Sequence, residues 1–275
     1  MNSKTPYSLM IDEQIEPFCQ EIPTKNVQKL PYDTIKYEIH IKKQDEQKYG
    51  IKQGKYVCIQ TSKTFVYLNK AKDFVANELS KVLNKFLKQA KFTQNQIVLV
   101  AGMGNGDVAC DSLGNLVTSR LLATEYLPEE LKKELGNLCF VNCGVGGKTG
   151  ISSFDVLMGV KEKVKPNIII MVDSLLTTDV KKIGTCFQVF GNSLIPGGGV
   201  GNSQEGFNKL NLDGNVISVG VPLLIQAKSL GKVKKGIEEM FFTPKEVDFY
   251  ARRCSQIIAD AINQSVHKSG YKKFF

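Results

Sequence analysis

Two aspartates in this chain follow patterns typical of buried strands, and carboxylates in that position can carry chemistry. Asp173 comes directly after the apolar run 168–172, and Asp111 follows the run 97–101 and a glycine turn. In an open α/β sheet, functional groups gather beyond the carboxyl ends of the strands. Two carboxylates that lie close together separate their pKa values, so one can act as base and the other as acid. The alternatives are a helix N-cap at Asp111 and a solvated loop residue or cap at Asp173.

Two glycine-rich segments resemble nucleotide-binding loops without matching them. The turn Gly102-Met103-Gly104-Asn105-Gly106 has no third glycine at the spacing of a dinucleotide-binding fingerprint. The segment 142–149 ends in Gly147-Lys148-Thr149, like a phosphate-binding loop, but Asn142 stands where that loop needs its first glycine. A structural glycine loop is therefore the preferred interpretation of the second segment, and nucleotide binding there is the alternative.

A third glycine cluster lies at 196–202 and has four glycines in the five positions 197–201. Such a cluster allows backbone to approach a bound peptide, an oxyanion or another chain segment closely. A flexible linker is the alternative, and the flanking Pro196 and Val200 make it less favoured.

Histidine and cysteine offer little to a catalytic or metal site. The chain has two histidines, His40 and His267, and both are expected to be structural or on the surface. Its seven cysteines form no C-x-x-C pair, so a zinc site is not predicted and no metal or other cofactor is expected. An odd number of cysteines within apolar runs, without a signal peptide, is typical of reduced thiols in a cytoplasmic protein. They are Cys19, Cys58, Cys110, Cys139, Cys143, Cys186 and Cys254.

Length and composition exclude several classes of protein. The 275 residues, 42% of them hydrophobic, suffice for one large domain or two small ones with a buried core. No apolar stretch reaches the roughly 18 residues of a membrane span, so no membrane partner is expected. The net charge of +9 is spread over the sequence and there is no tryptophan, so no direct role with nucleic acid is expected.

Strand and helix patterns alternate along the chain. The predicted strands are 35–41, 56–61, 97–101, 138–141, 168–172 and 216–221. The predicted helices are 72–89, 111–124, 153–165 and a last helix that begins at Pro244 and ends near Val266.

This alternation predicts an α/β fold: a single domain with a largely parallel central sheet flanked by helices, of the phosphorylase/hydrolase-like kind. Residues 1–30 contain three prolines, with a fourth at Pro31, and no clear periodicity, so they are expected to form an N-terminal arm. Residues 31–275 then form the α/β domain.

At these motifs the sequence resembles the spore germination protease family, the endopeptidases that degrade small acid-soluble spore proteins. The match runs in order from about Ile35 to Val266. Five segments carry it: the Gly104-Asn105 turn with Asp111-Ser112-Leu113-Gly114, the loop 144–151, Val172-Asp173-Ser174-Leu175, the cluster 196–202, and 243–248. The family has alanine after each aspartate, where this chain has Ser112 and Ser174. The family is more distantly similar in fold to hydrogenase-maturation endopeptidases.

The resemblance implies that Asp111 and Asp173 are catalytic, and it points to Asn105, Gly198, Gly199 and Asn202 as substrate-binding residues. It further implies small acid-soluble spore proteins as substrates, a propeptide within 1–30, a homotetramer, and a place in the cytoplasm of the forespore or in the spore core. The segment 12–16 does not reproduce the family's processing motif, and 179–182 departs from the family's usual Ser/Arg-rich stretch.

Peptide hydrolysis by the aspartate pair is therefore the leading hypothesis. A catalytically silent binding protein of the same fold is the second, and a nucleotide-binding enzyme that uses Gly147-Lys148-Thr149 is a weaker third.

Overall fold

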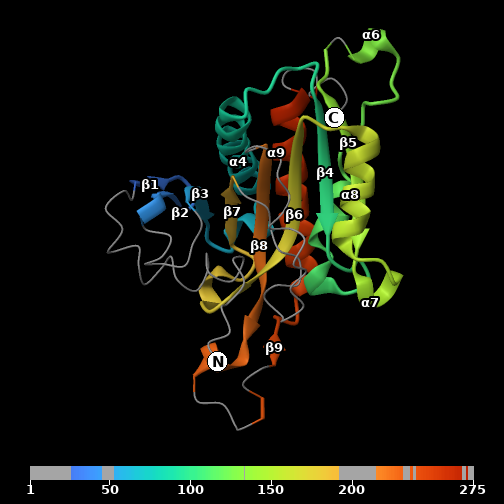
Figure 1. Ribbon diagram of the computed structural model, residues 1–275. Helices are drawn as coiled ribbons and strands as arrows, with labels where there is room; N and C mark the ends of the chain where they lie inside the picture. Colours follow the sequence, from blue (N-terminus) through green and yellow to red (C-terminus); the bar gives the residue numbers. More distant parts are fainter. Residues whose placement is uncertain are drawn as a thin grey trace.

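The computed structural model (Figure 1) describes residues 26–44, 53–132, 134–191, 215–231, 236–237, 240–267 and 271. Its centre is a nine-stranded sheet with the strand order β1-β2-β3-β7-β8-β6-β4-β5, and β9 pairs with β8 off this path. The strands are β1 (Asn26–Leu30), β2 (Thr34–Ile41), β3 (Gly54–Gln60), β4 (Ile97–Met103), β5 (Asn137–Gly144), β6 (Ile168–Thr177), β7 (Cys186–Phe190), β8 (Val216–Gln226) and β9 (Phe241–Phe242).

Parallel pairing is confined to four neighbouring strands, β5, β4, β6 and β8. All other described strand pairs are antiparallel. The apolar sequences of β4 and β6 suit strands that are covered on both faces. The predicted α/β sheet flanked by helices is thus confirmed, with its parallel part limited to these four strands.

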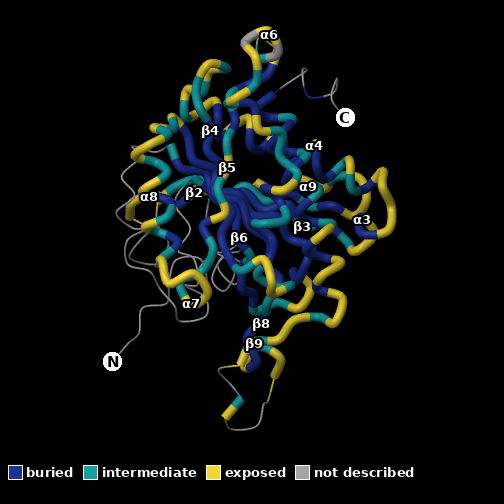
Figure 2. The backbone as a smooth tube through the Cα atoms, turned by 90° about the vertical axis from the view of Figure 1, so that its right-hand side faces the viewer, coloured by how far each residue is buried: buried dark blue, intermediate teal, exposed yellow. Residues whose placement is uncertain are grey.

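Helices cover both faces of the sheet. α4 (Asn69–Gln89) and α9 (Val247–His267) lie together on one face, and α8 (Ser153–Val164) lies on the other (Figure 1). In α4 the buried apolar residues recur every three or four positions, which turns one stripe of the helix toward the core. Two hydrophobic clusters result, one on each face of the sheet. Figure 2 shows the strands as the buried centre of the molecule and α7 as an exposed projection.

Short helices complete the described structure. They are α3 (Thr64–Tyr67), α5 (Leu113–Thr118), α6 (Glu129–Lys132), α7 (Gly146–Thr149) and the 3-10 helices η1 (Ala109–Asp111), η2 (Val180–Lys182) and η5 (Ala227–Leu230). None of the described helices is both long and apolar enough to cross a bilayer.

The predicted helix 111–124 was wrong at both ends. Residues 109–111 form η1, and the α-helix α5 covers only Leu113–Thr118. The chain leaves the helix because other partners take its polar groups: the Leu122 N–H donates to Asn263 Oδ1, and the Thr124 N–H donates to the Leu138 carbonyl oxygen. Tertiary contacts here override a helical pattern of apolar residues.

The predicted end of the strand 168–172 was also wrong, because β6 continues to Thr177. Pairing between β4 and β6 stops at Gly102 and Val172, while β6 goes on pairing with β8 through Leu176 and Thr177. Asp173 therefore lies inside a strand, at the point where that strand loses its neighbour β4.

Other predicted boundaries moved too, and the strand predicted at 216–221 continues to Gln226. Residues 26–30, within the predicted arm, form β1 along β2, and residues 1–25 lie outside the described part of the chain. The last helix begins at Val247 instead of Pro244, whose carbonyl oxygen accepts a hydrogen bond from the Val247 N–H.

Candidate active site

The turn after β4 holds the carboxylate of Asp111. The Asn105 N–H donates to Asp111 Oδ2 at 2.7 Å. Gly104 has a φ of +91°, and a methyl group there would lie 2.2 Å from the Asp111 carbonyl oxygen. Only glycine satisfies both demands, the left-handed backbone and the close approach. Asp111 accepts this bond from the turn and caps no helix, since Ser112 occupies the N-cap position of α5.

The short helix α5 sits directly on the backbone of the sheet. A methyl group at Gly114 would lie 2.4 Å from the Met103 carbonyl oxygen and 2.8 Å from that of Val172. The absence of a side chain lets the helix approach β4 and β6 at the level where Asp173 follows Val172. This close packing places Asp111, at the entrance to α5, beside Asp173.

Asp173 is a buried carboxylate whose side chain meets no described cation. It is 6% exposed, and its Oδ1 accepts a hydrogen bond from the Ser174 N–H at 2.8 Å. Burial raises its pKa well above the usual range, and the negative charge of Asp111 raises it further. Burial also raises the pKa of Asp111, and the hydrogen bond from Asn105 opposes this shift. Asp173 is therefore the member of the pair that more readily keeps a proton.

Two cysteines flank the carboxylates. Burial, together with the charge of Asp173, raises the pKa of the Cys143 thiol to about 12. Burial and the charge of Asp111 also raise the pKa of the Cys110 thiol. Both thiols therefore stay protonated near neutral pH, and neither has the thiolate character of a cysteine nucleophile.

Asn105, predicted to bind substrate, shapes the turn. Its side-chain oxygen accepts a hydrogen bond from the Asp107 N–H at 3.1 Å, and its own backbone N–H donates to Asp111 Oδ2. The neighbouring Asp107 forms an ion pair with Lys148, which joins the turn after β4 to the turn after β5.

At 147–149, where a phosphate-binding loop was the alternative interpretation, the Lys148 and Thr149 side chains contact groups of the protein itself. Lys148 contacts a carboxylate, and the Thr149 hydroxyl lies within hydrogen-bond distance of the Val145 and Ile151 carbonyl oxygens. The segment holds itself together through these contacts.

Sequence reasoning missed two polar residues beside the pair. Ser174 follows Asp173, and within the described residues its buried hydroxyl oxygen has no hydrogen-bond partner. The same holds for the side-chain oxygen of Asn115, four residues after Asp111, whose amide nitrogen lies against Gly106. The repeated Asp-Ser-Leu at 111–113 and 173–175 was the available signal for Ser174.

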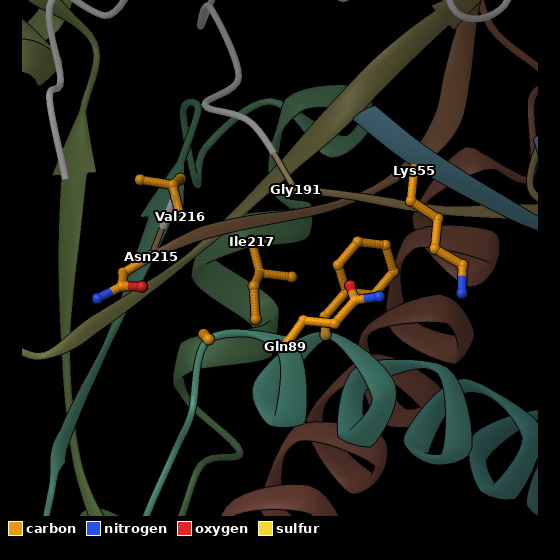
Figure 3. A pocket seen from close by; sticks show the side chains of 8 residues that line it. Lys55, Gln89, Gly191, Asn215, Val216 and Ile217 are labelled. Carbon is orange, nitrogen blue, oxygen red and sulfur yellow. The ribbon is translucent and has the colours of Figure 1, made fainter. Parts of the chain in front are cut away.

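The other predicted substrate-binding residues, Gly198, Gly199 and Asn202, lie outside the described residues. The described chain stops at Gly191 and resumes at Asn215, and both residues line a cavity of about 270 Å³ together with Lys55, Gln89 and Ile217 (Figure 3). Val216, also in its wall, pairs with Ile169, four residues before Asp173 on β6. Four residues of strand are about 13 Å, so this cavity is separate from the aspartates.

The histidines lie away from the pair. His267 is buried at the end of α9, and its Nε2 lies 2.9 Å from the Leu122 carbonyl oxygen. His40 is exposed on β2. Within the described ranges, no group of three or more His, Cys, Asp or Glu side chains is arranged to hold a metal ion.

Comparison with known proteins decides the family. A family model described as "Germination protease" matches residues 9–237. The chain belongs to the germination protease family. The family resemblance is thereby confirmed, and the family is one of proteases that act in spore germination.

Several germination proteases are similar in sequence to this chain. The germination protease of Clostridium acetobutylicum is 25% identical, over 88% of this chain and 86% of the relative. Those of a Geobacillus species and of Bacillus velezensis are 30% and 31% identical, each over 70% of this chain and 53% of the relative. This chain therefore matches about half the length of the latter two germination proteases.

A solved structure is also similar. The [NiFe] hydrogenase maturation protease HycI from Thermococcus kodakarensis has a TM-score of 0.36 and 18% identity, over 66% of this chain and 98% of that protein.

Proposed function

We propose that this germination protease is an endopeptidase that hydrolyses small acid-soluble spore proteins during spore germination, with Asp111 and Asp173 as its catalytic residues. The observation that supports this most is the coupling of the two carboxylates. They share a site without a described cation, and the charge of Asp111 helps to raise the pKa of Asp173. Enzymes use this device to keep one acid and one base at the same pH.

The direction of the pKa shifts supports an assignment of roles. Asp111, stabilised as a carboxylate by the Asn105 N–H, takes a proton from water as the water oxygen bonds to the scissile carbonyl carbon. Asp173 gives its proton to the leaving nitrogen as the carbon–nitrogen bond breaks. The proton on Asp111 then returns to Asp173, which restores the pair. Backbone N–H groups of the glycine segments after β4 and β5 are the candidate donors to the oxyanion.

Other parts of the proposal come from the family resemblance. We propose that the residues before β1, 1–25, act as a propeptide, which makes the protein a zymogen. We also propose a homotetramer in the cytoplasm of the forespore or in the spore core.

Intact-mass spectrometry of a purified small acid-soluble spore protein tests the proposal. Wild type, a form trimmed of residues 1–25 that keeps β1, and the Asp111→Asn, Asp173→Asn and Asp248→Asn variants of the trimmed form are incubated with it in parallel. Asp248→Asn is the matched control because this aspartate is exposed on α9. We expect discrete fragments with the trimmed form and the control, and none with either active-site variant.

Each other outcome has a defined meaning. Cleavage by the trimmed form and not by untrimmed wild type would identify residues 1–25 as an inhibitory propeptide. No cleavage by any form would overturn the protease proposal in favour of the silent binding protein. Full activity of Asp111→Asn or Asp173→Asn would overturn the mechanism.

A further inference from the structure

Strand β5 forms one edge of the described sheet. It pairs with β4 on one side, and within the described residues no strand pairs with its other side. Edge strands usually carry charged residues or proline, which prevent another strand from pairing with them. The sequence of β5, NLCFVNCG, has neither.

The beginning of this edge is already occupied. The Thr124 N–H donates to the Leu138 carbonyl oxygen at 2.9 Å, and the Leu138 N–H donates to Thr124 Oγ1 at 2.9 Å. Leu138 thus directs its backbone groups away from β4. Because these groups alternate in direction along a strand, those of Phe140 and Asn142 also point outward.

The side chains at these positions are open to solvent. Phe140 is 40% exposed, and Asn142 is exposed as well. Thr118 Oγ1 contacts Asn142 Oδ1 at 2.6 Å, which ties this part of the edge to α5. An uncharged edge with an exposed aromatic ring suits an extended peptide, whose backbone pairs with the strand while its side chains pack against the ring.

The open edge of β5 lies two strands away from the position of Asp173 in β6. Asn142 pairs with Gly102, and Gly102 pairs with Val172, the residue before Asp173. Two strand spacings, or about 10 Å, therefore separate this part of β5 from β6. Beyond Gly144 the chain enters the turn whose Lys148 contacts Asp107, in the loop that holds Asp111.

We propose that the polypeptide substrate binds as an added strand along Phe140–Asn142 of β5. This inference rests on the proposed peptidase function and identifies the surface that holds the substrate. An added strand lies about 14 Å from β6, and about four residues of extended chain cover that distance. Pairing with β5 therefore involves substrate residues that lie several positions from the peptide bond that is cut.

The substitution Phe140→Pro tests this directly. Proline removes an outward N–H that β4 does not use, and edge positions of that kind tolerate proline. We expect kcat/KM on the spore protein to fall about tenfold through KM, a size in line with the loss of a backbone hydrogen bond and the ring contact. On a six-residue peptide centred on the mapped cleavage site, the loss should shrink to about twofold.

Two further variants separate the contribution of the Phe140 ring from that of the Phe140 backbone N–H. Phe140→Val keeps the N–H and removes the ring, and we expect a loss of about threefold on the spore protein. Tyr67→Ala removes an exposed aromatic ring from α3, which packs against α4, and we expect wild-type kcat/KM. Equal losses for Phe140→Pro on the spore protein and on the short peptide would overturn the proposal.

Hydrogen exchange provides a test that does not depend on how Phe140→Pro folds. The inactive Asp111→Asn protein, mixed with the spore protein, should protect the amides of Phe140 and Asn142. Cleavage by wild type without this protection would overturn the added strand and leave the peptidase function standing. A change in oligomer mass by light scattering on Phe140→Pro would also overturn it, by assigning the edge to contacts between copies.

Discussion

Two acidic sites in this protein are almost equally buried and have opposite electrostatics. Asp173, in the parallel half of the sheet, is 6% exposed, and Glu78, on α4 beside the antiparallel half, is 5% exposed. Burial alone raises the pKa of both carboxyls. At Glu78, hydrogen bonds and charges from Lys81 and Lys36 outweigh burial and lower the pKa. At Asp173 the nearest charge is that of Asp111, and the pKa rises.

The difference distinguishes a structural carboxylate from a candidate catalytic one. Lys36 Nζ and Lys81 Nζ lie 3.5 Å and 2.6 Å from the oxygens of Glu78, and Glu38 contacts Lys55 and Lys85 in the same way. Two of these ion pairs, Lys36–Glu78 and Lys85–Glu38, connect β2 to α4. Asp173 has no such partner among the described residues, so its burial costs stability, as expected at a functional site.

The largest effect is expected from a substitution of Asp173, the carboxylate without a cation partner in the described structure. Asp173→Asn should lower peptide cleavage at least about a thousandfold. It should also raise the free energy of unfolding at pH 7 by about 1–3 kcal/mol, because the carboxyl is ionised in water at that pH and must be protonated, or buried as a charge, on folding, whereas asparagine is neutral in both states. Cleavage kinetics and urea unfolding measure the two effects. A variant that is both inactive and less stable than wild type would contradict this account of the site.

The pH dependence of stability follows from the same shift. The folded protein keeps a proton on Asp173 above the ordinary pKa of 3.8, so it binds more protons than the unfolded chain in that window. The contribution of Asp173 to stability is therefore complete below 3.8 and is lost as pH rises through its raised pKa. The gain from Asp173→Asn should be large at pH 7 and small near pH 4, as urea unfolding at several pH values will measure.

The next effect concerns the contact that brings the two aspartates together. Gly114→Ala places a methyl group against backbone atoms of Met103 and Val172, so α5 must move away from the sheet. We expect a loss of about 2–4 kcal/mol in unfolding free energy and a lower kcat. Gly147→Ala is the matched control, because a methyl group there meets nothing within 4 Å. Equal melting temperatures for both variants would show that close packing at Gly114 is not required.

A smaller effect is expected at the paired carboxylate. Glu78→Gln removes the negative charge that pairs with two lysines and should cost about 1–2 kcal/mol of stability without a change in kcat. The lowered pKa of Glu78 stabilises the fold above its ordinary value of 4.5, and this contribution is lost as pH falls through the lowered value. Unfolding at pH 7 and pH 3 should therefore show a difference from wild type that is smaller in acid.

The smallest expected effect is at Ser174. Its hydroxyl is buried without a hydrogen-bond partner in the described structure, so Ser174→Ala should leave stability unchanged or raise it by up to about 1 kcal/mol. Thermal unfolding checks this. A clear loss of stability would mean that the hydroxyl has a partner in solution.

The sequence predicted the α/β sheet, most of its strands and the position of both aspartates near strand ends, because these depend on local apolar patterns; it could not give the separation of the two carboxylates. The antiparallel pairing of β7 with β3 and β8 was not predictable, since it joins segments far apart in the chain. The early end of α5 and the extension of β6 past Asp173 depend on the partners Leu138 and β8. The packing at Gly114 and the unpaired Ser174 hydroxyl likewise needed tertiary structure.

Carbon-13 NMR titration of the aspartate side-chain carboxyls, in wild type and in Asp111→Asn, tests the coupled pair most directly. We predict that Asp173 titrates well above its ordinary pKa of 3.8 in wild type and that this pKa falls in Asp111→Asn, where the neighbouring negative charge is gone. An Asp173 that titrates near 3.8 in both proteins would contradict the shared acid–base site.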